Sequence, residues 1–181
     1  MNTRKTLITA LFTGLIIVGT FIKVPMPPVP ITLQTLFVIL AALLGGFNIG
    51  FFSFVVYLIL GTIGLPIFSS GGGIGALIGP TGGYLFGMLL ATIIAGLISD
   101  MGKNKEYKLP YFIIGGLLAT IAIYLIGIPW LKLATGMEMA KAIKVGVIPF
   151  LIGDVIKLIV AVLLTTKFYD RIQQLIKVEI D

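Results

Sequence analysis

The stretch that decides the fold class is Leu109–Ile128, with the sequence LPYFIIGGLLATIAIYLIGI. It runs for twenty residues without a single charged side chain. The hydrocarbon core of a bilayer is about 30 Å thick, and a helix needs about 20 mostly apolar residues to cross it. The stretch therefore predicts a transmembrane helix, and Pro129 directly after it predicts where that helix ends.

Five more apolar segments lie on either side of this stretch. The six expected spans are residues 7–22, 32–44, 51–65, 82–98, 109–128 and 147–166. Of all residues, 58% are hydrophobic and only 11% are charged, whereas a soluble domain carries about 25% charged residues. Because such a chain cannot cover a water-facing surface, we predict an all-α membrane protein with six transmembrane helices, forming one domain over residues 1–181.

The distribution of Lys and Arg predicts the orientation of these spans. With the N-terminus inside, eight positive side chains fall on the cytoplasmic side and four on the outer side. The inner set is Arg4, Lys5, Lys103, Lys105, Lys108, Lys167, Arg171 and Lys177, and the outer set is Lys23, Lys132, Lys141 and Lys144. Both termini are therefore expected in the cytoplasm of a multi-pass cell-membrane protein. Since topology accounts for the net charge of +6, no nucleic-acid partner is expected.

The connection between the third and fourth spans, residues 66–81, is an outer loop rich in Gly and Pro. Both residue types destabilise helices, so we expect no regular helix there. The two inner connections, residues 45–50 and 99–108, are short. In the first span, Ala10 and Gly14, with Gly19 further on, form a strip of small residues that permits close helix contact. Packing within this chain is slightly favoured over docking of another subunit.

The chain contains neither Cys nor His. This excludes thiolate nucleophiles, Cys-ligated metal centres and the usual general base. An intramembrane enzyme would need Asp154 with Lys157 or a tyrosine as its acid–base pair, an alternative that we disfavour. We expect neither an enzyme nor a bound cofactor.

One pair of charges lies inside a predicted span, in Gly153-Asp154-Val155-Ile156-Lys157. Asp154 and Lys157 are three residues apart, so they share one helix face. A charge at bilayer depth costs roughly 2.5–3.5 kcal/mol and usually has a function. A ligand site is favoured over a self-neutralising pair that only holds helices together.

Further polar candidates occur at the starts of two spans. After the run of prolines from Pro25 to Pro30, Thr32 either caps the second span or contacts a ligand. Gln34 needs a partner in an apolar span, and we favour a ligand. In Gly79-Pro80-Thr81-Gly82-Gly83-Tyr84, Thr81 is a candidate cap, and the glycines allow close approach of a ligand or helix.

In these segments the chain resembles the biotin-specific S component of energy-coupling factor (ECF) vitamin transporters, the BioY family. The similar stretches are Pro27–Thr35, Tyr57 to Phe68, Gly71–Tyr84 and Gly153–Lys157, and they follow one another in the family's order.

The resemblance implies a six-helix membrane protein of the bacterial plasma membrane that binds biotin near its outer surface, under a lid formed by the loop between helices three and four. It also implies two kinds of partner, a transmembrane coupling subunit and two cytoplasmic ATPases. The ligand-binding residues expected are Asp154, Lys157, Gln34, Thr32, Tyr84, Thr81, Gly72 and Gly73. Alternatives are an S component for another small vitamin and a helix-bundle assembly protein without transport activity.

Overall fold

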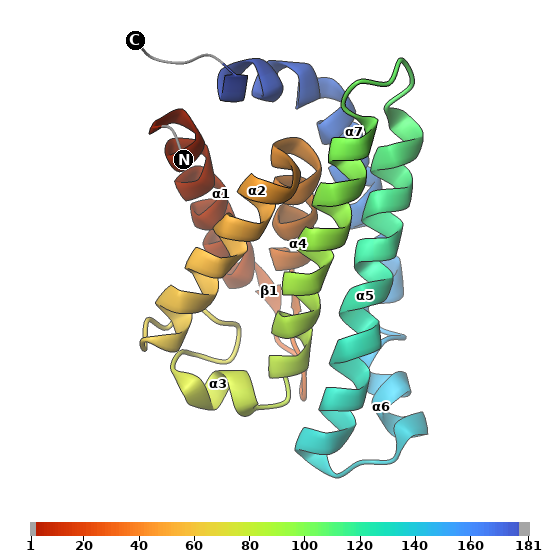
Figure 1. Ribbon diagram of the computed structural model, residues 1–181. Coiled ribbons are helices and arrows are strands. Elements are labelled where there is room, and N and C mark those ends of the chain that lie inside the picture. The colour runs from red at the N-terminus through yellow and green to blue at the C-terminus, as the bar shows by residue number, and fades with distance from the viewer. Residues whose placement is uncertain (1–2, 178–181) are drawn as a thin grey trace.

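The computed structural model describes residues 3–177, with side chains to residue 176, so the ends of the expected domain and the charge of Lys177 lie outside it. The described chain is almost entirely helical (Figure 1). Its elements are α1 (Thr3–Phe21), β1 (Lys23–Val24), β2 (Ile31–Thr32), α2 (Gln34–Thr62), α3 (Ile74–Ile78), α4 (Gly82–Gly102), α5 (Leu109–Thr135), α6 (Met139–Gly146) and α7 (Leu151–Lys177).

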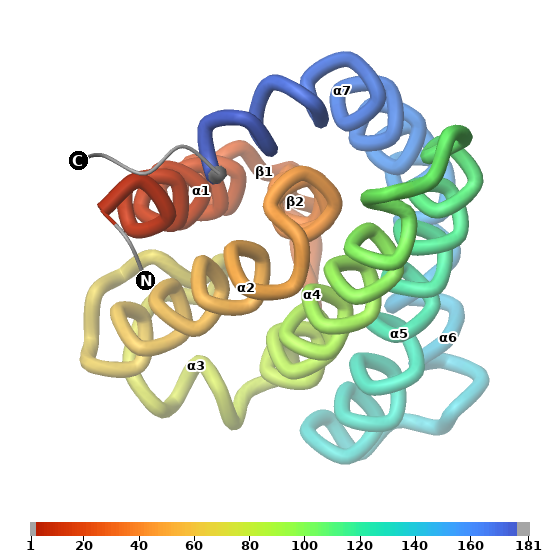
Figure 2. The backbone as a smooth tube through the Cα atoms, turned by 45° about the horizontal axis from the view of Figure 1, so that its top comes forward, coloured from red at the N-terminus to blue at the C-terminus, as the bar shows by residue number. Residues whose placement is uncertain are grey.

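Helix α2 contains both the second and the third expected spans, and it is broken at Gly46. Gly46 has φ +70°, which lies outside the helical region. Figures 1 and 2 show the chain reversing direction there. The two halves pack so closely that a Cβ on Gly50 would lie 2.5 Å from the Cα of Ala42. The expected inner loop at residues 45–50 is thus reduced to a turn at one glycine.

Four helices are long and apolar enough to cross a membrane, namely α1, α2, α4 and α5. Helices α6 and α7, bent by 50° relative to each other, qualify together as a fifth. The span count of six stays a prediction, because it requires each half of α2 to cross separately.

Helix α5 does not end before Pro129 as expected but continues to Thr135. Proline removes one backbone donor from a helix, and packing on either side compensates for this loss. Leu131 is fully buried, and Gly127 packs against the ring of Tyr84.

The outer connection between α2 and α4 also differs from expectation, because residues 74–78 form the short helix α3. The glycines precede this segment, whose own sequence is Ile-Gly-Ala-Leu-Ile, and the side chain of Ala76 is buried. The prediction of a loop without a helix was therefore wrong. Burial of one apolar turn outweighs the helix-weakening effect of a single internal glycine.

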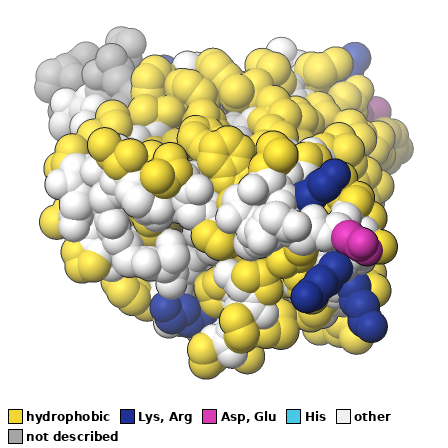
Figure 3. Space-filling model, turned by 90° about the horizontal axis from the view of Figure 1, so that it is seen from below, with side chains coloured by type: hydrophobic (Ala, Val, Ile, Leu, Met, Phe, Trp, Pro, Cys, Tyr) yellow, Lys and Arg dark blue, Asp and Glu magenta, His cyan; other side chains and the backbone are white. Residues whose placement is uncertain are grey.

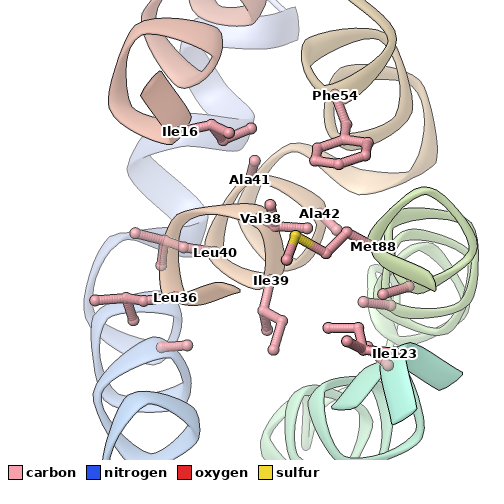
Figure 4. Close-up of a cluster of buried hydrophobic side chains, with 14 of the residues drawn as sticks. Ile16, Leu36, Val38, Ile39, Leu40, Ala41, Ala42, Phe54, Met88 and Ile123 are labelled. Atoms are coloured by element: carbon pink, nitrogen blue, oxygen red, sulfur yellow. The ribbon is translucent and has the colours of Figure 1, made fainter. Parts of the chain in front are cut away.

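The first half of α2 forms the centre of the bundle (Figure 4). Val38, Ala41, Ala42 and Leu43 are completely buried. Around this half lie α1, α4, α5 and α7, which contribute core side chains such as Ile16, Met88 and Ile123. The N-terminal residues of α2 are thereby held at the place where the helices α4, α5 and α7 converge.

At the end of the bundle where α2 turns, buried side chains tie the helices together. Ser99 Oγ donates to the carbonyl of Leu43 at 2.6 Å, and Gln173 Nε2 donates to the carbonyl of Leu44 at 2.9 Å. The carboxylate of Asp100 accepts from the backbone N–H of Phe47 at 2.9 Å. It therefore caps the second half of α2. The start of α1 and the end of α7 lie at this same end (Figure 1).

The opposite end carries the β1–β2 hairpin, α3 and α6, and Figure 3 views it directly. Its surface is mostly uncharged, with many apolar side chains, and most of its charges lie at one edge. On the side of the bundle, the strip of Ala10 and Gly14 faces outward, since both residues are exposed and a Cβ on Gly14 would meet nothing within 4 Å. The expected packing within the chain is therefore wrong for Ala10 and Gly14, whereas Gly19 is buried against Phe37 of α2.

Candidate ligand-binding site

Asp154 and Lys157 lie on one face of α7, near its N-terminus, as their spacing predicts. Lys157 Nζ lies 2.7 Å from Asp154 Oδ1. The two side chains are only 8% and 13% exposed, for Lys157 and Asp154 respectively. Both charges are therefore largely removed from solvent and compensated by each other.

Two side chains from other helices complete this pair. The hydroxyl of Tyr124, on α5, donates to Asp154 Oδ2, and Lys157 Nζ donates to Thr35 Oγ1, on α2, at 3.1 Å. The pair is thus a polar link between α2, α5 and α7. Sequence reasoning did not select Tyr124 or Thr35. The signal for Tyr124 was a hydroxyl inside an uncharged span, which needs a hydrogen-bond partner.

This network lines a cavity at the hairpin end of the bundle. The lining residues are Val29, Pro30, Thr32, Gln34, Thr35, Ser69, Thr81, Tyr84, Met88, Ile123, Tyr124, Phe150, Asp154 and Lys157. Six of the eight expected site residues therefore meet around one space.

Gln34 is the most unusual of the cavity residues. Its side chain is 2% exposed, and its Nε2 atom has no hydrogen-bond partner among the described residues. A buried polar group without a partner costs roughly 1–3 kcal/mol, so a ligand acceptor at this position would recover energy. Leu33, not Thr32, is the N-cap residue of α2. Thr32 Oγ1 accepts from the backbone N–H of Gln34 at 3.3 Å, and Thr32 also lines the cavity.

Tyr84 and Thr81 use their hydroxyls to hold other parts of the site in place. The hydroxyl of Tyr84 donates to the carbonyl of Gly146 at 3.0 Å, and its ring stacks with Phe150. Thr81 Oγ1 lies 3.1 Å from Ser70 Oγ in the outer loop. Their contribution to the cavity wall is therefore an aromatic face and a small polar surface.

Gly72 and Gly73 do not line the cavity. A Cβ on Gly72 would overlap the carbonyl oxygen of Leu65, and Gly73 has φ +84°. The N–H of Gly73 donates to the carbonyl of Gly61 at 2.7 Å. These glycines shape the loop, whereas Ser69, which sequence reasoning did not select, is the loop residue that faces the cavity.

The profile of the BioY family matches residues 1–174. The chain belongs to the BioY family. It is similar to the probable biotin transporter BioY of Pyrococcus horikoshii, with 41% identity over 92% of this chain and 97% of the relative. The biotin transporter BioY of Thermotoga maritima is 38% identical over 91% of this chain and 95% of its own.

The fold has a solved counterpart. A crystal structure of the S component for biotin from an ECF-type ABC transporter matches with a TM-score of 0.82 and 27% identity, over 93% of this chain and 94% of that one. Membership in this family confirms that the chain is not an enzyme. It is a multi-pass protein of the cell membrane, with the fold of an ECF S component.

Proposed function

We propose that this chain is the biotin-binding S component of an ECF-type transporter and needs no cofactor of its own. The single observation that carries the proposal is the buried Lys157–Asp154 pair, with its Tyr124 and Thr35 partners, on the wall of a cavity. Separating the two charges of a buried ion pair is costly. The site therefore suits a polar ligand that forms hydrogen bonds with Asp154 and Lys157 while the pair stays intact. The names of the family relatives support biotin as that ligand.

The chemistry of biotin matches the groups around the cavity. Two of the three ammonium hydrogens of Lys157 are used, by Asp154 and Thr35, and the third can reach a ligand carboxylate or carbonyl. Each oxygen of Asp154 can accept a second hydrogen bond, which suits a ureido N–H. The Nε2 atom of Gln34 is a donor for the ureido carbonyl. Thr32, Thr81 and Tyr84 then form the wall around the fused rings of biotin.

The second part of the proposal is that the outer loop between α2 and α4 acts as a lid over the cavity. The outer loop is fastened by Lys23 Nζ, which donates to the carbonyl of Ser69 at 2.9 Å, and by the contact between Ser70 and Thr81. The first contact joins the loop to the β1–β2 hairpin, and the second joins it to the start of α4. The hairpin and the start of α4 are the two edges of the cavity. We infer that biotin enters when these contacts open, with Gly72 and Gly73 acting on loop shape rather than on the ligand.

For the topology, we propose six crossings, with each half of α2 crossing once and both termini in the cytoplasm. The reversal at Gly46 and the common end of α1 and α7 support an even number of crossings. Cysteines introduced at Asn104 and at Ser70 should react with an impermeant reagent from opposite sides of the membrane. Labelling of both from outside contradicts this topology.

The proposed partners are a transmembrane coupling subunit and two cytoplasmic ATPases. The chain has no Walker lysine motif, so ATP hydrolysis must come from other subunits. The outward strip of Ala10 and Gly14 is a surface on which a second membrane helix can approach closely. Replacing Gly14 by Leu should abolish biotin uptake by cells that contain the coupling subunit and ATPases, while biotin binding by the purified variant is unchanged.

The direct test of function is isothermal titration of the detergent-purified chain with biotin, with thiamine and riboflavin as comparison ligands. Saturable one-to-one binding of biotin alone is the expected result. Tight binding of a comparison ligand instead identifies an S component for another vitamin. Binding of none of the three favours the helix-bundle assembly protein, in which the pair is architectural.

A further inference from the structure

The short helix α3 of the outer loop has an exposed apolar face that is separate from the proposed biotin site. Ile74 and Ile78 are 67% and 66% exposed, whereas Ala76 is buried. Because residues four apart lie on the same side of a helix, the two isoleucines share one face. None of residues 74–78 lines the cavity. Two large apolar side chains therefore point away from both the core and the cavity.

This face adjoins an exposed apolar surface at the end of α2. Ile59 and Ile63 are also four residues apart, and they are 55% and 72% exposed. Since α2 is apolar enough to cross a membrane, these side chains face lipid. Helix α3 begins beside them, because the N–H of Gly73 donates to the carbonyl of Gly61 at 2.7 Å. The lipid-facing surface of the bundle thus continues from α2 to the start of α3.

Trp130, the single tryptophan of the chain, indicates the depth of α3 in the membrane. Its indole N–H donates to the carbonyl of Gly79, the C-cap residue of α3, at 3.0 Å. Its ring packs against that of Phe86 on α4. Tryptophans are enriched at the membrane–water interface, where the ring meets hydrocarbon and the N–H meets polar groups. Helix α3 therefore lies at the level at which α4 and α5 leave the hydrocarbon.

Charge is absent from the whole outer loop. No charged residue occurs in the sequence between Lys23 and Asp100. The charged residues of this end belong to the hairpin, the end of α5 and the segment that forms α6, and they are Lys23, Lys132, Glu138, Lys141 and Lys144. A charged side chain is costly to place in a bilayer. Contact of α3 with lipid removes no charge from water.

The backbone of α3 also suits contact with lipid. The N–H of Ala76 donates to the carbonyl of Gly73, and the N–H of Gly79 donates to the carbonyl of Gly75, both at 3.1 Å. Irregular backbone is not tolerated against hydrocarbon, because its polar groups would lack partners. A helical turn supplies those partners within the segment itself. This requirement gives a second reason why residues 74–78 are helical despite their glycine.

We propose that α3 anchors the outer loop in the bilayer, with Ile74 and Ile78 among the acyl chains of outer-leaflet phospholipids, just below the headgroups. Interfacial helices bury their apolar face to this depth. The choice of leaflet rests on the topology proposed above, and the consequence for the lid rests on the proposed function. Because the bilayer holds α3, only residues 66–73, which bring Ser69 to the cavity, move when the site opens. Helix α3 keeps its depth with and without biotin.

The test is the depth of nitroxide spin labels on the full chain in phosphatidylcholine nanodiscs. The chain has no Cys, so Ile74→Cys and Ile78→Cys each create a single labelling position. Power saturation compares collisions with molecular oxygen, which concentrates in hydrocarbon, and with a water-soluble nickel chelate. Both labels should shift toward the oxygen-rich ratio of Leu117→Cys, an exposed position in the middle of α5. The matched control Ser70→Cys, in the same loop and exposed, should give the aqueous ratio.

Three results would overturn the proposal. A ratio at residues 74 and 78 equal to that at residue 70 means that α3 lies in water. Exclusion of both oxygen and nickel means that a second copy of the chain covers this face. A change of ratio at residue 78 when biotin is added means that α3 moves with the lid. Biotin titration of the same labelled variants tests the proposed function separately, because the depth of a label can be measured whether or not biotin binds.

Discussion

At the end that holds the cavity, the helices are joined by long, irregular connections, whereas at the opposite end α2 turns back at one glycine and α4 joins α5 through a few residues. The cavity end keeps a buried charged pair on the wall of a cavity and loops fastened by single hydrogen bonds. At the opposite end, buried hydrogen bonds tie α2 directly to α4 and α7. The difference indicates that recognition and stability are assigned to different ends of the same bundle.

Exchanging one aspartate at each end tests this assignment most strongly. Asp154→Asn should lower biotin affinity roughly 10- to 100-fold, because one charge-assisted acceptor worth about 1.5–3 kcal/mol is lost. Asp100→Asn should leave affinity unchanged and lower thermal stability, since the capped N–H of Phe47 loses a charged partner. Isothermal titration and thermal unfolding of both variants measure the two effects. Equal affinity for Asp154→Asn and the unaltered chain removes Asp154 from the site.

Gly46→Ala should be the most damaging change at the opposite end. An L-residue in the left-handed region costs roughly 1–2 kcal/mol, and the added Cβ would overlap the carboxylate of Asp100. The melting temperature should fall, with biotin affinity of the folded fraction retained. Gly71→Ala is the control, because it shares a positive φ but its Cβ meets nothing within 4 Å. If both variants have the same melting temperature, steric overlap with Asp100 does not contribute to the destabilisation by Gly46→Ala.

At the cavity end, Gly72→Ala should loosen the lid. Its Cβ would overlap the Leu65 carbonyl, so the closed loop is disfavoured and biotin should dissociate several-fold faster. Hydrogen exchange across residues 68–79 should be slowed by biotin in the unaltered chain and less so in the variant. Gly75→Ala, with open space around its Cβ, should behave like the unaltered chain. Exchange that is identical with and without biotin would mean that the loop is a fixed part of the surface.

The smallest effect is expected for Lys23→Ala. The bond from its ammonium to the carbonyl of Ser69 is exposed, and exposed polar contacts contribute about 1 kcal/mol or less. Biotin dissociation should therefore accelerate less than about fivefold. Lys132→Ala, which removes a charge from the end of α5 without touching the loop, supplies the control. A larger effect would make Lys23 the main fastening of the lid.

The sequence allowed prediction of those features that depend on composition and local spacing. Membrane helices followed from apolar runs, and the Asp154–Lys157 pair followed from a spacing of three. It did not allow prediction of features fixed by packing between distant segments. The contacts of Lys157 with Thr35 and of Asp154 with Tyr124 join residues 122 and 30 positions apart. No local pattern could indicate them.

The errors have the same origin. Pro129 and the glycines before α3 were interpreted by their intrinsic effect on a helix, which burial of neighbouring side chains overrides. The strip of Ala10 and Gly14 was assigned to internal packing, because a sequence pattern cannot distinguish an inward from an outward face. The contact of Gly72 and Gly73 with a ligand stays a prediction, because these glycines lie outside the cavity lining, where the loop backbone turns tightly against Leu65 and Gly61.

The turn at Gly46 also determines where this protein can be cut. Because that connection has no spare residue and a side chain of α4 occupies its concave side, an epitope tag or protease site inserted there would separate the two halves of α2. Asn104, Lys105 and Glu106, between α4 and α5, are exposed. Exposed connections are the preferred places for insertion and chain cleavage. A chain expressed as two fragments divided at residue 105 should therefore reassemble in the membrane, whereas one divided at residue 46 should not.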